Sequence, residues 1–277
     1  MQIFSAAFVL FAAVSVAHAA PVASEHIEVE LVSENSALVP GQTAHLGLRL
    51  KHEPGWHTYW TNPGDSGLPT KLSWTLPRGF SAGEIAWPAP TRFKVDDLYN
   101  FGYTGEVVLP VALAVPANAT TGSNVALAVE AKWLVCHEVC VPGKAQLKLD
   151  VPVATKALAD PRYGLAFAQA RLSTPLATLP ARARIAGEHV TVTLATPGLS
   201  FVPDDALAAQ KQIVASTPPR ITRQGETLIV DFAKSEYFTG EPAGFDLVLT
   251  SRAANEPVWQ GRAVFSNKNA VNSPAPR

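Results

Sequence analysis

The sequence has little of several residue types, and each shortage excludes a class of protein. Its 277 residues include two cysteines and one methionine, which excludes a disulfide-rich scaffold and a store for soft metals. The net charge is −1 and no basic stripe is present, so neither nucleic acid nor lipid is expected as a partner. After residue 20 no uncharged apolar run approaches about 18 residues, so the mature chain is expected to lack a membrane-spanning helix.

The first twenty residues have the pattern of a secretory signal peptide. Residues 3–16 are an uncharged apolar run that is too short to span a bilayer. Ala17-His18-Ala19 then supplies the small residues of a cleavage site, so cleavage is expected after Ala19 or Ala20. The segment before the apolar run lacks Lys and Arg, which is atypical. Export to an oxidising compartment is predicted, where two cysteines can form a disulfide.

Alternation of apolar and polar residues predicts an all-β fold. The period of two recurs along the chain, and 23 prolines and 18 glycines are spread between the apolar runs. Strands are expected at 27–31, 44–50, 72–76, 107–115, 125–135, 147–153, 190–194, 228–232, 245–249 and 259–265. Short strands separated by turns are typical of β-sandwiches, so two such domains are predicted.

The predicted domain boundaries follow from the breaks in this pattern. A first β-sandwich is expected at 21–155 and a second at 176–266, with a linker at 156–175 between them. Asp160-Pro161 is typical of a helix start, so the linker is expected to contain a short helix at 163–172. Residues 91–105 are predicted to be a long loop. The polar tail at 267–277 is expected to be disordered.

The only two cysteines, Cys136 and Cys140, lie at the end of the 125–135 strand pattern with three residues between them. A three-residue hairpin loop brings the flanking Cα atoms to roughly 5–6 Å, which permits a disulfide. Cys136 is out of phase with the apolar face, so its side chain is predicted to point away from the core. His137 should then point to the opposite face of the strand.

The cysteine pair allows three interpretations. A structural staple is one, but a ring this small removes little conformational entropy from the unfolded chain. A reversible redox pair is favoured, with a partner's thiolate attacking the bond. We expect the attack at Cys136, because Cys140 is followed by Val141-Pro142 and is predicted to be less accessible. Copper(I) binding by Cys136 and Cys140, with His137 as a further ligand, is the third interpretation. No cofactor is expected, and zinc would need more ligands than the sequence supplies.

A series of motifs over residues 25–155 resembles the N-terminal periplasmic region of the DsbD family of thiol:disulfide interchange proteins. The matching residues are Gly55-Trp56-His57-Thr58-Tyr59-Trp60, Asn62-Pro63-Gly64-Asp65-Ser66-Gly67, Trp74-Thr75-Leu76-Pro77, Trp87-Pro88, Tyr99-Asn100-Phe101-Gly102-Tyr103, Trp133-Leu134-Val135-Cys136 and Cys140-Val141-Pro142-Gly143. The series is most similar to the ScsB-type members, which are associated with copper tolerance. The second domain resembles the rest of the ScsB-type region more loosely.

The resemblance implies immunoglobulin-like β-sandwiches with an exposed redox pair, matched by Cys136 and Cys140. Family members take electrons from a membrane-embedded domain and pass them to periplasmic thioredoxin-fold proteins, in processes that include cytochrome c biogenesis. No membrane domain follows in this sequence, so a separate DsbD-type donor in the membrane is expected. The spacing of the two cysteines also differs from that of the best-known members.

The resemblance also implies side chains around the pair. Family members cover their cysteines with a loop that bears an aromatic residue. Tyr99, Phe101 and Tyr103 are the candidates for this shielding role, with Phe101 preferred. Trp56, Tyr59, Trp60 and His137 are expected to border the site.

Overall fold

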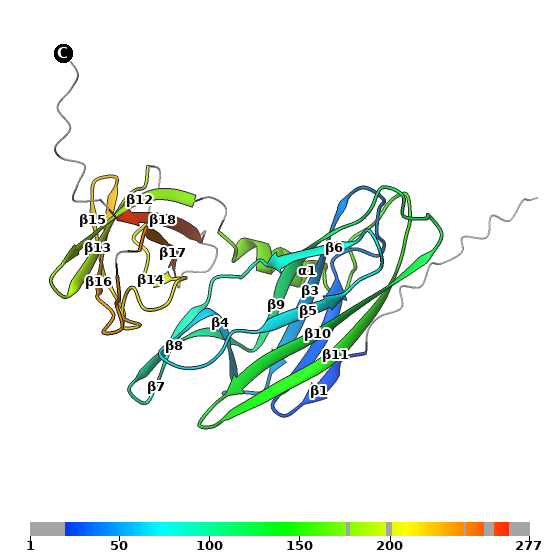
Figure 1. The fold of residues 1–277 in the computed structure, drawn as a ribbon, viewed down its shortest axis with the longest axis horizontal. Coiled ribbons are helices and arrows are strands. Elements are labelled where there is room, and N and C mark those ends of the chain that lie inside the picture. The colour runs from blue at the N-terminus through cyan, green and yellow to red at the C-terminus, as the bar shows by residue number, and fades with distance from the viewer. Residues whose placement is uncertain (1–19, 176–177, 198–200, 241, 252–257, 266–277) are drawn as a thin grey trace, which may run out of the picture.

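The computed structural model describes residues 20–175, 178–197, 201–240, 242–251 and 258–265. Figure 1 shows two β-rich parts, with the helix α1 (Gly164–Leu172) between them. No helix in these described ranges has the length and apolar character needed to cross a membrane. Apart from Ala20, the predicted signal peptide lies outside the described residues, and so does the predicted tail at 267–277.

Two antiparallel sheets form the N-terminal part. The first has the order β1-β2-β3-β9-β6 and consists of β1 (Val22–Ser24), β2 (Ile27–Ser33), β3 (Thr43–His52), β9 (Glu106–Ala114) and β6 (Ser81–Ile85). The second has the order β11-β10-β4-β8-β7 and consists of β11 (Cys140–Pro152), β10 (Asn124–Cys136), β4 (His57–Gly64), β8 (Leu98–Thr104) and β7 (Thr91–Val95). A further strand, β5 (Lys71–Thr75), pairs with β10.

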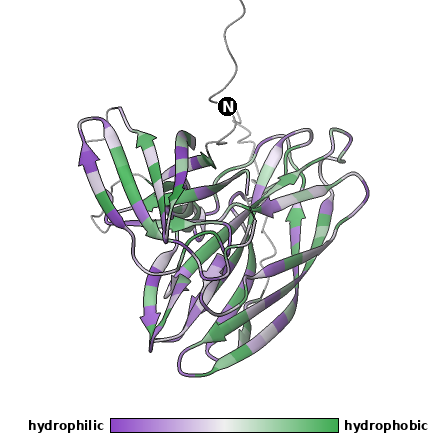
Figure 2. Ribbon diagram, turned by 60° about the vertical axis from the view of Figure 1, so that its left-hand side comes forward, coloured by the Kyte–Doolittle hydropathy of each residue, from purple (hydrophilic) through white to green (hydrophobic). Residues whose placement is uncertain are grey.

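The core of this part lies between its two sheets. Leu48 and Leu109 from the first sheet and Leu127 and Leu147 from the second belong to one buried cluster. Figure 2 shows hydrophobic and hydrophilic residues alternating along the long strands. Successive side chains of a strand point to opposite faces, so this alternation buries one face of each sheet. The result is a β-sandwich of the immunoglobulin-like kind.

The hairpin of β10 and β11 carries the cysteines. Its two strands pair without a register shift from Asn124↔Pro152 to Cys136↔Cys140, and residues 137–139 close the turn. The Gly143 backbone lies against the Trp133 ring, and a Cβ at Gly143 would come within 2.3 Å of the ring. Glycine at this position therefore lets Trp133 enter the core.

Residues 91–105, predicted as a loop, instead contain the whole β7–β8 hairpin. Its register runs from Thr91↔Gly102 to Val95↔Leu98, and the turn uses Asp96 with φ 52°. Asp tolerates this left-handed conformation better than most residues. The sequence did not predict the hairpin because Arg92 and Asn100, both polar, occupy buried positions that break the apolar pattern.

The C-terminal part is one continuous seven-stranded sheet. Its order is β14-β17-β18-β12-β13-β16-β15, formed by β14 (Asp205–Ala208), β17 (Gly244–Thr250), β18 (Trp259–Phe265), β12 (Thr178–Ala186), β13 (His189–Ala195), β16 (Thr227–Ala233) and β15 (Arg220–Gln224). β12 and β18 pair in parallel, and the other pairs are antiparallel. Val192, Phe232 and Phe245 lie in its separate buried cluster.

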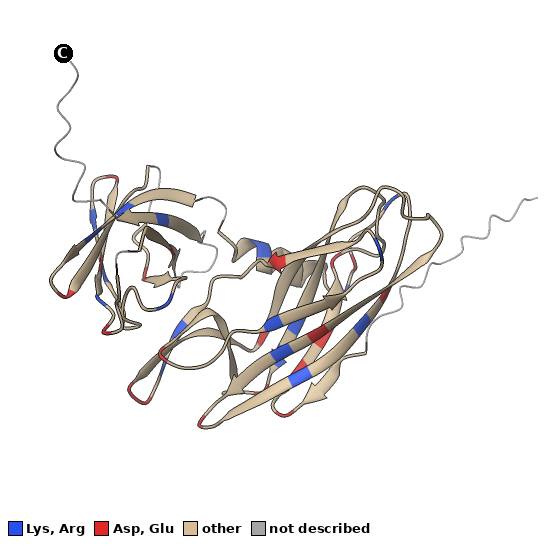
Figure 3. Ribbon diagram, in the orientation of Figure 1, with Lys and Arg blue, Asp and Glu red and all other residues tan. Residues whose placement is uncertain are grey.

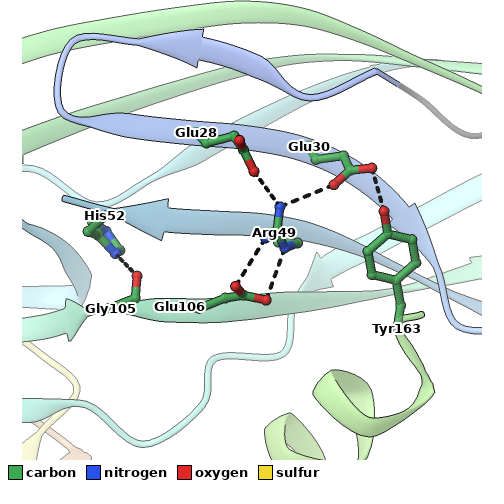
Figure 4. Close-up of polar contacts among 7 residues, drawn as sticks. All are labelled: Glu28, Glu30, Arg49, His52, Gly105, Glu106 and Tyr163. Carbon is green, nitrogen blue, oxygen red and sulfur yellow. Dashed lines mark hydrogen bonds and ion pairs between the residues drawn. The ribbon is translucent and has the colours of Figure 1, made fainter. Parts of the chain in front are cut away.

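A charged cluster ties α1 to the first sheet. Figure 4 shows Arg49 between three carboxylates, with bonds of 2.7 Å to Glu28 and 3.3 Å to Glu30 and a two-oxygen contact with Glu106. Tyr163, just before α1, donates a hydrogen bond of 2.5 Å to Glu30. Burial, together with this bond to Glu30, raises the pKa of Tyr163 to about 12. Elsewhere on the ribbon, Lys and Arg are interspersed with Asp and Glu (Figure 3).

Candidate redox site

Cys136 and Cys140 are joined by a disulfide across the last pair of the β10–β11 hairpin. Their Cα atoms are 4.1 Å apart. The turn is closed by the His137 N–H, which donates to the Val139 carbonyl at 3.0 Å. The hairpin therefore places both sulfurs at one end of the second sheet, as the spacing predicted.

The two sulfurs differ in access, in the opposite sense to the prediction. Cys136 is 1% exposed, whereas Cys140 is exposed to solvent. The alternation does place Cys136 on the outer face of the sheet, but neighbouring side chains bury it there, because β4 pairs with the end of β10 at Cys136↔His57 and carries His57 and Tyr59 on the same face. The expectation that Cys140 is the less accessible cysteine is wrong. Cys140 is therefore the more exposed cysteine of the two.

A chain of polar contacts leads from β4 to Cys140. Tyr59 Oη lies 3.8 Å from Cys140 Sγ, and His57 Nε2 lies 3.3 Å from Tyr59 Oη. His57 and Tyr59 are two residues apart on β4, so they share the outer face with Cys136. In one consistent arrangement, neutral His57 donates to Tyr59, and the Tyr59 hydroxyl donates to the cysteine sulfur.

The loop after β4 seals Tyr59, which is 1% exposed. Gly67, with φ +93°, lies directly on the phenol ring, and a Cβ there would come within 2.2 Å of it. Pro69 forms a bridge with Tyr59, and the Ser66 hydroxyl of the loop donates a hydrogen bond to the Asn100 side chain of β8. The series of residues from Asn62 to Gly67 thus serves as a cover for the tyrosine next to the disulfide.

Burial controls the charge states of this cluster. Burial, together with the neighbouring His52 and His137, lowers the pKa of His57 to about 4. Burial also raises the pKa of Tyr59, although a bond with Ser66 opposes this. At neutral pH both groups are therefore uncharged, and the polar chain to Cys140 is a neutral one.

The depressed pKa of His57 predicts a loss of stability in acid. Unfolded His57 takes up a proton below about pH 6.5, while the folded protein resists it down to about pH 4, so stability falls between these values. From pH 7 to pH 4 the free energy of unfolding should decrease by about 3 kcal/mol because of His57 alone. Urea unfolding at several pH values measures this. Buried His52, whose pKa is also lowered by burial, adds in the same direction.

The matched variants for this prediction are His57→Gln and His189→Gln. His189 is an exposed histidine of the C-terminal sheet, with its ring near Asp231. We expect His57→Gln to remove most of the acid dependence between pH 6.5 and pH 4, and His189→Gln to leave it unchanged. Equal acid dependence in wild type and His57→Gln would contradict the assigned role of burial.

Trp56 and His137 lie near the turn that joins the two cysteines. His137 lies in the exposed turn, and its ring centroid is 5.9 Å from that of half-buried Trp56. On its other side Trp56 stacks on His26 at 3.6 Å. Val139 in the same turn is 63% exposed. Together Trp56, His137 and Val139 form a partly apolar rim beside Cys140.

The other predicted border and shielding residues lie elsewhere. Trp60, Phe101 and Tyr103 belong to the core cluster of the sandwich. Because Tyr103 pairs with Thr58, it shares a face with Trp60, opposite the face that carries His57 and Tyr59. Tyr103 donates to the Pro88 carbonyl at 2.7 Å, and half-buried Tyr99 lies beneath Lys94. The structure therefore does not bring these aromatics to the cysteines, and the choice of Phe101 does not fit its position.

The aromatic residue of the β7–β8 hairpin on the correct face is Phe93, which sequence analysis missed. Its ring centroid lies 4.3 Å from that of His57. It occupies the position opposite Asn100, on the outer side of the sheet. The signal was in the sequence, since Phe93 lies in the expected loop, but only the strand pairing shows which aromatics face outwards.

The described residues hold no group of three or more His, Cys, Asp and Glu side chains arranged to bind a metal ion. Cys136 and Cys140 would have to supply copper(I) ligands as thiolates, after reduction of the disulfide. Copper binding therefore remains a prediction. Titration of the reduced protein with copper(I), with Cys136→Ser for comparison, would test it.

Comparisons with known proteins identify relatives of this arrangement. Residues 28–152 match the family described as "Thiol:disulfide interchange protein DsbD, N-terminal". The fold is similar to that of the N-terminal periplasmic domain of ScsB from Proteus mirabilis, with a TM-score of 0.66 and 19% identity. That match covers 91% of this chain and 99% of the other.

Two further solved structures are much less similar. An I-band fragment of titin, I67–I69, gives a TM-score of 0.19 at 11% identity and covers 89% of this chain and 66% of its own. A protein from Porphyromonas gingivalis gives 0.23 at 10% identity and covers 86% and 99%. These scores are too low to carry an argument. No curated protein sequence matches the chain.

Proposed function

Because residues 28–152 match the family of the DsbD N-terminal domain, we propose that this chain is a periplasmic thiol–disulfide exchange protein that relays electrons through Cys136 and Cys140. The observation that carries the proposal is the unequal pair: an exposed Cys140 bonded to a buried Cys136. A structural staple gains nothing from such exposure, whereas an exchange site needs one sulfur within reach of a partner.

The first step is attack by a partner's thiolate on Cys140 Sγ. A bond forms between the partner's sulfur and Cys140, and the Cys136–Cys140 bond breaks. Cys136 leaves with the electron pair and takes up a proton. The partner's second thiolate then attacks the partner's first sulfur in the mixed disulfide, and Cys140 leaves as a thiolate. The partner dithiol is oxidised, and the Cys136/Cys140 pair is reduced by two electrons.

The second half of the relay is the reverse reaction with another protein. The Cys140 thiolate attacks a disulfide of a periplasmic thioredoxin-fold protein, and Cys136 resolves the mixed disulfide as the acceptor is reduced. A DsbD-type protein in the membrane is the proposed electron donor. The rim of Trp56, His137 and Val139 beside Cys140 is the proposed contact surface for both partners.

The Tyr59 hydroxyl is proposed to assist by stabilising the Cys140 thiolate. At 3.8 Å it is placed to donate a hydrogen bond to the sulfur, and a bond to a charged acceptor favours the charged form. In the reduced protein, Tyr59→Phe should therefore raise the pKa of the Cys140 thiol by about one unit. The pH dependence of alkylation by iodoacetamide, followed by mass spectrometry of the Cys140 peptide, measures this pKa.

Tyr103→Phe is the matched control for this prediction, because it removes another buried phenol hydroxyl on the opposite face of the same sheet. It should leave the pKa of Cys140 at its wild-type value. If Tyr59→Phe and Tyr103→Phe give the same thiol pKa, Tyr59 plays no part in the exchange.

The experiment that tests the proposed function is equilibration of the pair with reduced and oxidised glutathione. A relay requires a reduction potential less negative than about −300 mV, whereas structural disulfides lie below that value. Rapid exchange with an oxidised thioredoxin-fold protein, used as the probe, is expected in addition. A potential below this limit, together with no exchange, would leave only a binding module with a structural disulfide.

A further inference from the structure

The two parts of the molecule meet at a buried guanidinium. Arg92 of β7 is held by the C-terminal sheet: Nε and Nη2 each donate to one oxygen of Asp205 at 2.8 Å. Nη2 also donates to the Ala206 carbonyl at 2.9 Å, and Nη1 donates to the Ser216 carbonyl. The Arg92 side chain is 6% exposed, and its charged group lies over the Phe101 ring. A bidentate pair with such burial fixes both distance and orientation.

A second contact attaches β4 to the same strand of the C-terminal sheet. The Asn62 side chain donates to the Ala208 carbonyl at 2.7 Å, while its oxygen accepts from the Gly64 N–H. Leu207, between these anchor points on β14, lies in the core cluster of the N-terminal sandwich together with Val248 of β17. Strand β14 is therefore packed into the sandwich by both polar and apolar contacts.

The anchored strands carry the side chains that lead to the disulfide. Phe93 follows Arg92 on β7 and points to the other face, where it contacts His57. His57 and Tyr59 lie on β4, which is the strand anchored through Asn62, and Tyr59 reaches Cys140. On β7, Arg92 is thus held by the C-terminal sheet, while the adjacent Phe93 contacts His57 of the redox cluster.

We propose that the C-terminal sheet is a positioning element of the redox site. Through Arg92 and Asn62, β14 holds β7 and β4 so that Phe93, His57 and Tyr59 stay closed around Cys136. The inference uses the proposed function for its biological meaning, but it concerns the chemical reactivity of the disulfide. The other interpretation is that the C-terminal sheet is a spacer, with no influence on the cysteines.

The test uses the whole protein with Arg92→Met, which keeps an unbranched side chain but removes the bonds to Asp205. If β7 is released, water reaches the Cys136 thiolate as it leaves, so reduction of the disulfide by dithiothreitol should become about tenfold faster. Arg92→Lys, which keeps the charge but not the bidentate geometry, should give an intermediate rate. The second readout is the pKa of His57, measured by NMR, which should rise from about 4 as the ring is hydrated.

Arg262→Met is the control, since it removes an Arg–Asp pair within the C-terminal sheet, at Asp246, that is partly exposed. It should change neither the reduction rate nor the His57 pKa. Asn62→Ala is a second variant at the interface, for use if Arg92→Met does not fold, and it should accelerate reduction as well. A wild-type reduction rate together with a wild-type His57 pKa, in folded Arg92→Met or Asn62→Ala protein, would overturn the proposal. The C-terminal sheet would then be a spacer.

The two proposals fail in distinguishable ways. Exchange with a thioredoxin-fold protein can be absent while Arg92→Met still accelerates reduction by dithiothreitol. That result would end the electron relay and leave the positioning role intact. Normal exchange combined with an unchanged dithiothreitol rate in Arg92→Met would end the positioning role alone.

Discussion

In the reduced protein, Cys136→Ser is expected to be alkylated about 100-fold faster than Cys140→Ser, because a buried thiol reacts only after local opening that costs about 3 kcal/mol. The first variant keeps the exposed Cys140 thiol, next to the Tyr59 hydroxyl. The second keeps Cys136, which is 1% exposed beside β4. The rates with iodoacetamide at pH 8 measure the difference.

The same variants decide which cysteine forms the mixed disulfide. Cys136→Ser should trap partners through Cys140, since the resolving thiol is gone, whereas Cys140→Ser should trap almost none. In urea both thiols should react at similar rates, which controls for their intrinsic reactivity. Faster alkylation of Cys136 than of Cys140 in the folded protein would reverse the order of attack that we propose.

The largest loss of stability is expected for Arg49→Met. Its side chain joins strands β2, β3 and β9 through Glu28, Glu30 and Glu106, and Glu30 is buried. Removing the cation leaves Glu30 without its charged partner in a buried position, which should reduce the free energy of unfolding by roughly 4 kcal/mol. Urea unfolding at pH 7, followed by circular dichroism, measures the change.

Glu28→Gln is the control for Arg49→Met. Glu28 is partly exposed, so losing its charge should cost less than about 1 kcal/mol. Acid should act through the same cluster: the bond with Arg49 lowers the pKa of Glu106, so its stabilising contribution is present above about pH 4.5 and is lost as the pH falls. An Arg49→Met protein as stable as Glu28→Gln would show that the carboxylates do not need the cation.

Much of the candidate site follows from short-range patterns. The spacing of Cys136 and Cys140 after a long alternating run predicted both the hairpin and the bond across it, since a three-residue turn leaves the flanking side chains on one face. The spacing and the alternation depend on residues close together in the chain, whose relative geometry is limited by backbone sterics. The expectation that Trp56 and Tyr59 border the cysteines came instead from the family resemblance.

The access of each cysteine could not be predicted in this way. Cys136 is buried because β4, about eighty residues earlier in the chain, pairs with the end of β10. This pairing places His57 and Tyr59 on the same outer face of the sheet as Cys136. The alternation within β10 defines two faces but does not say which of them another strand will cover. The same reason explains why Phe101 and Tyr103 were chosen and Phe93 was missed.

By itself the sequence determined an all-β fold with a disulfide-forming pair at a hairpin end, because side-chain periodicity and loop length act over a few residues. Tertiary structure alone decided that Cys140 is the exposed cysteine, that Tyr59 lies beside it, and that Arg92 attaches its hairpin to the C-terminal sheet. These contacts join residues separated by up to 124 positions. They depend on how complete sheets pack, which no local pattern specifies.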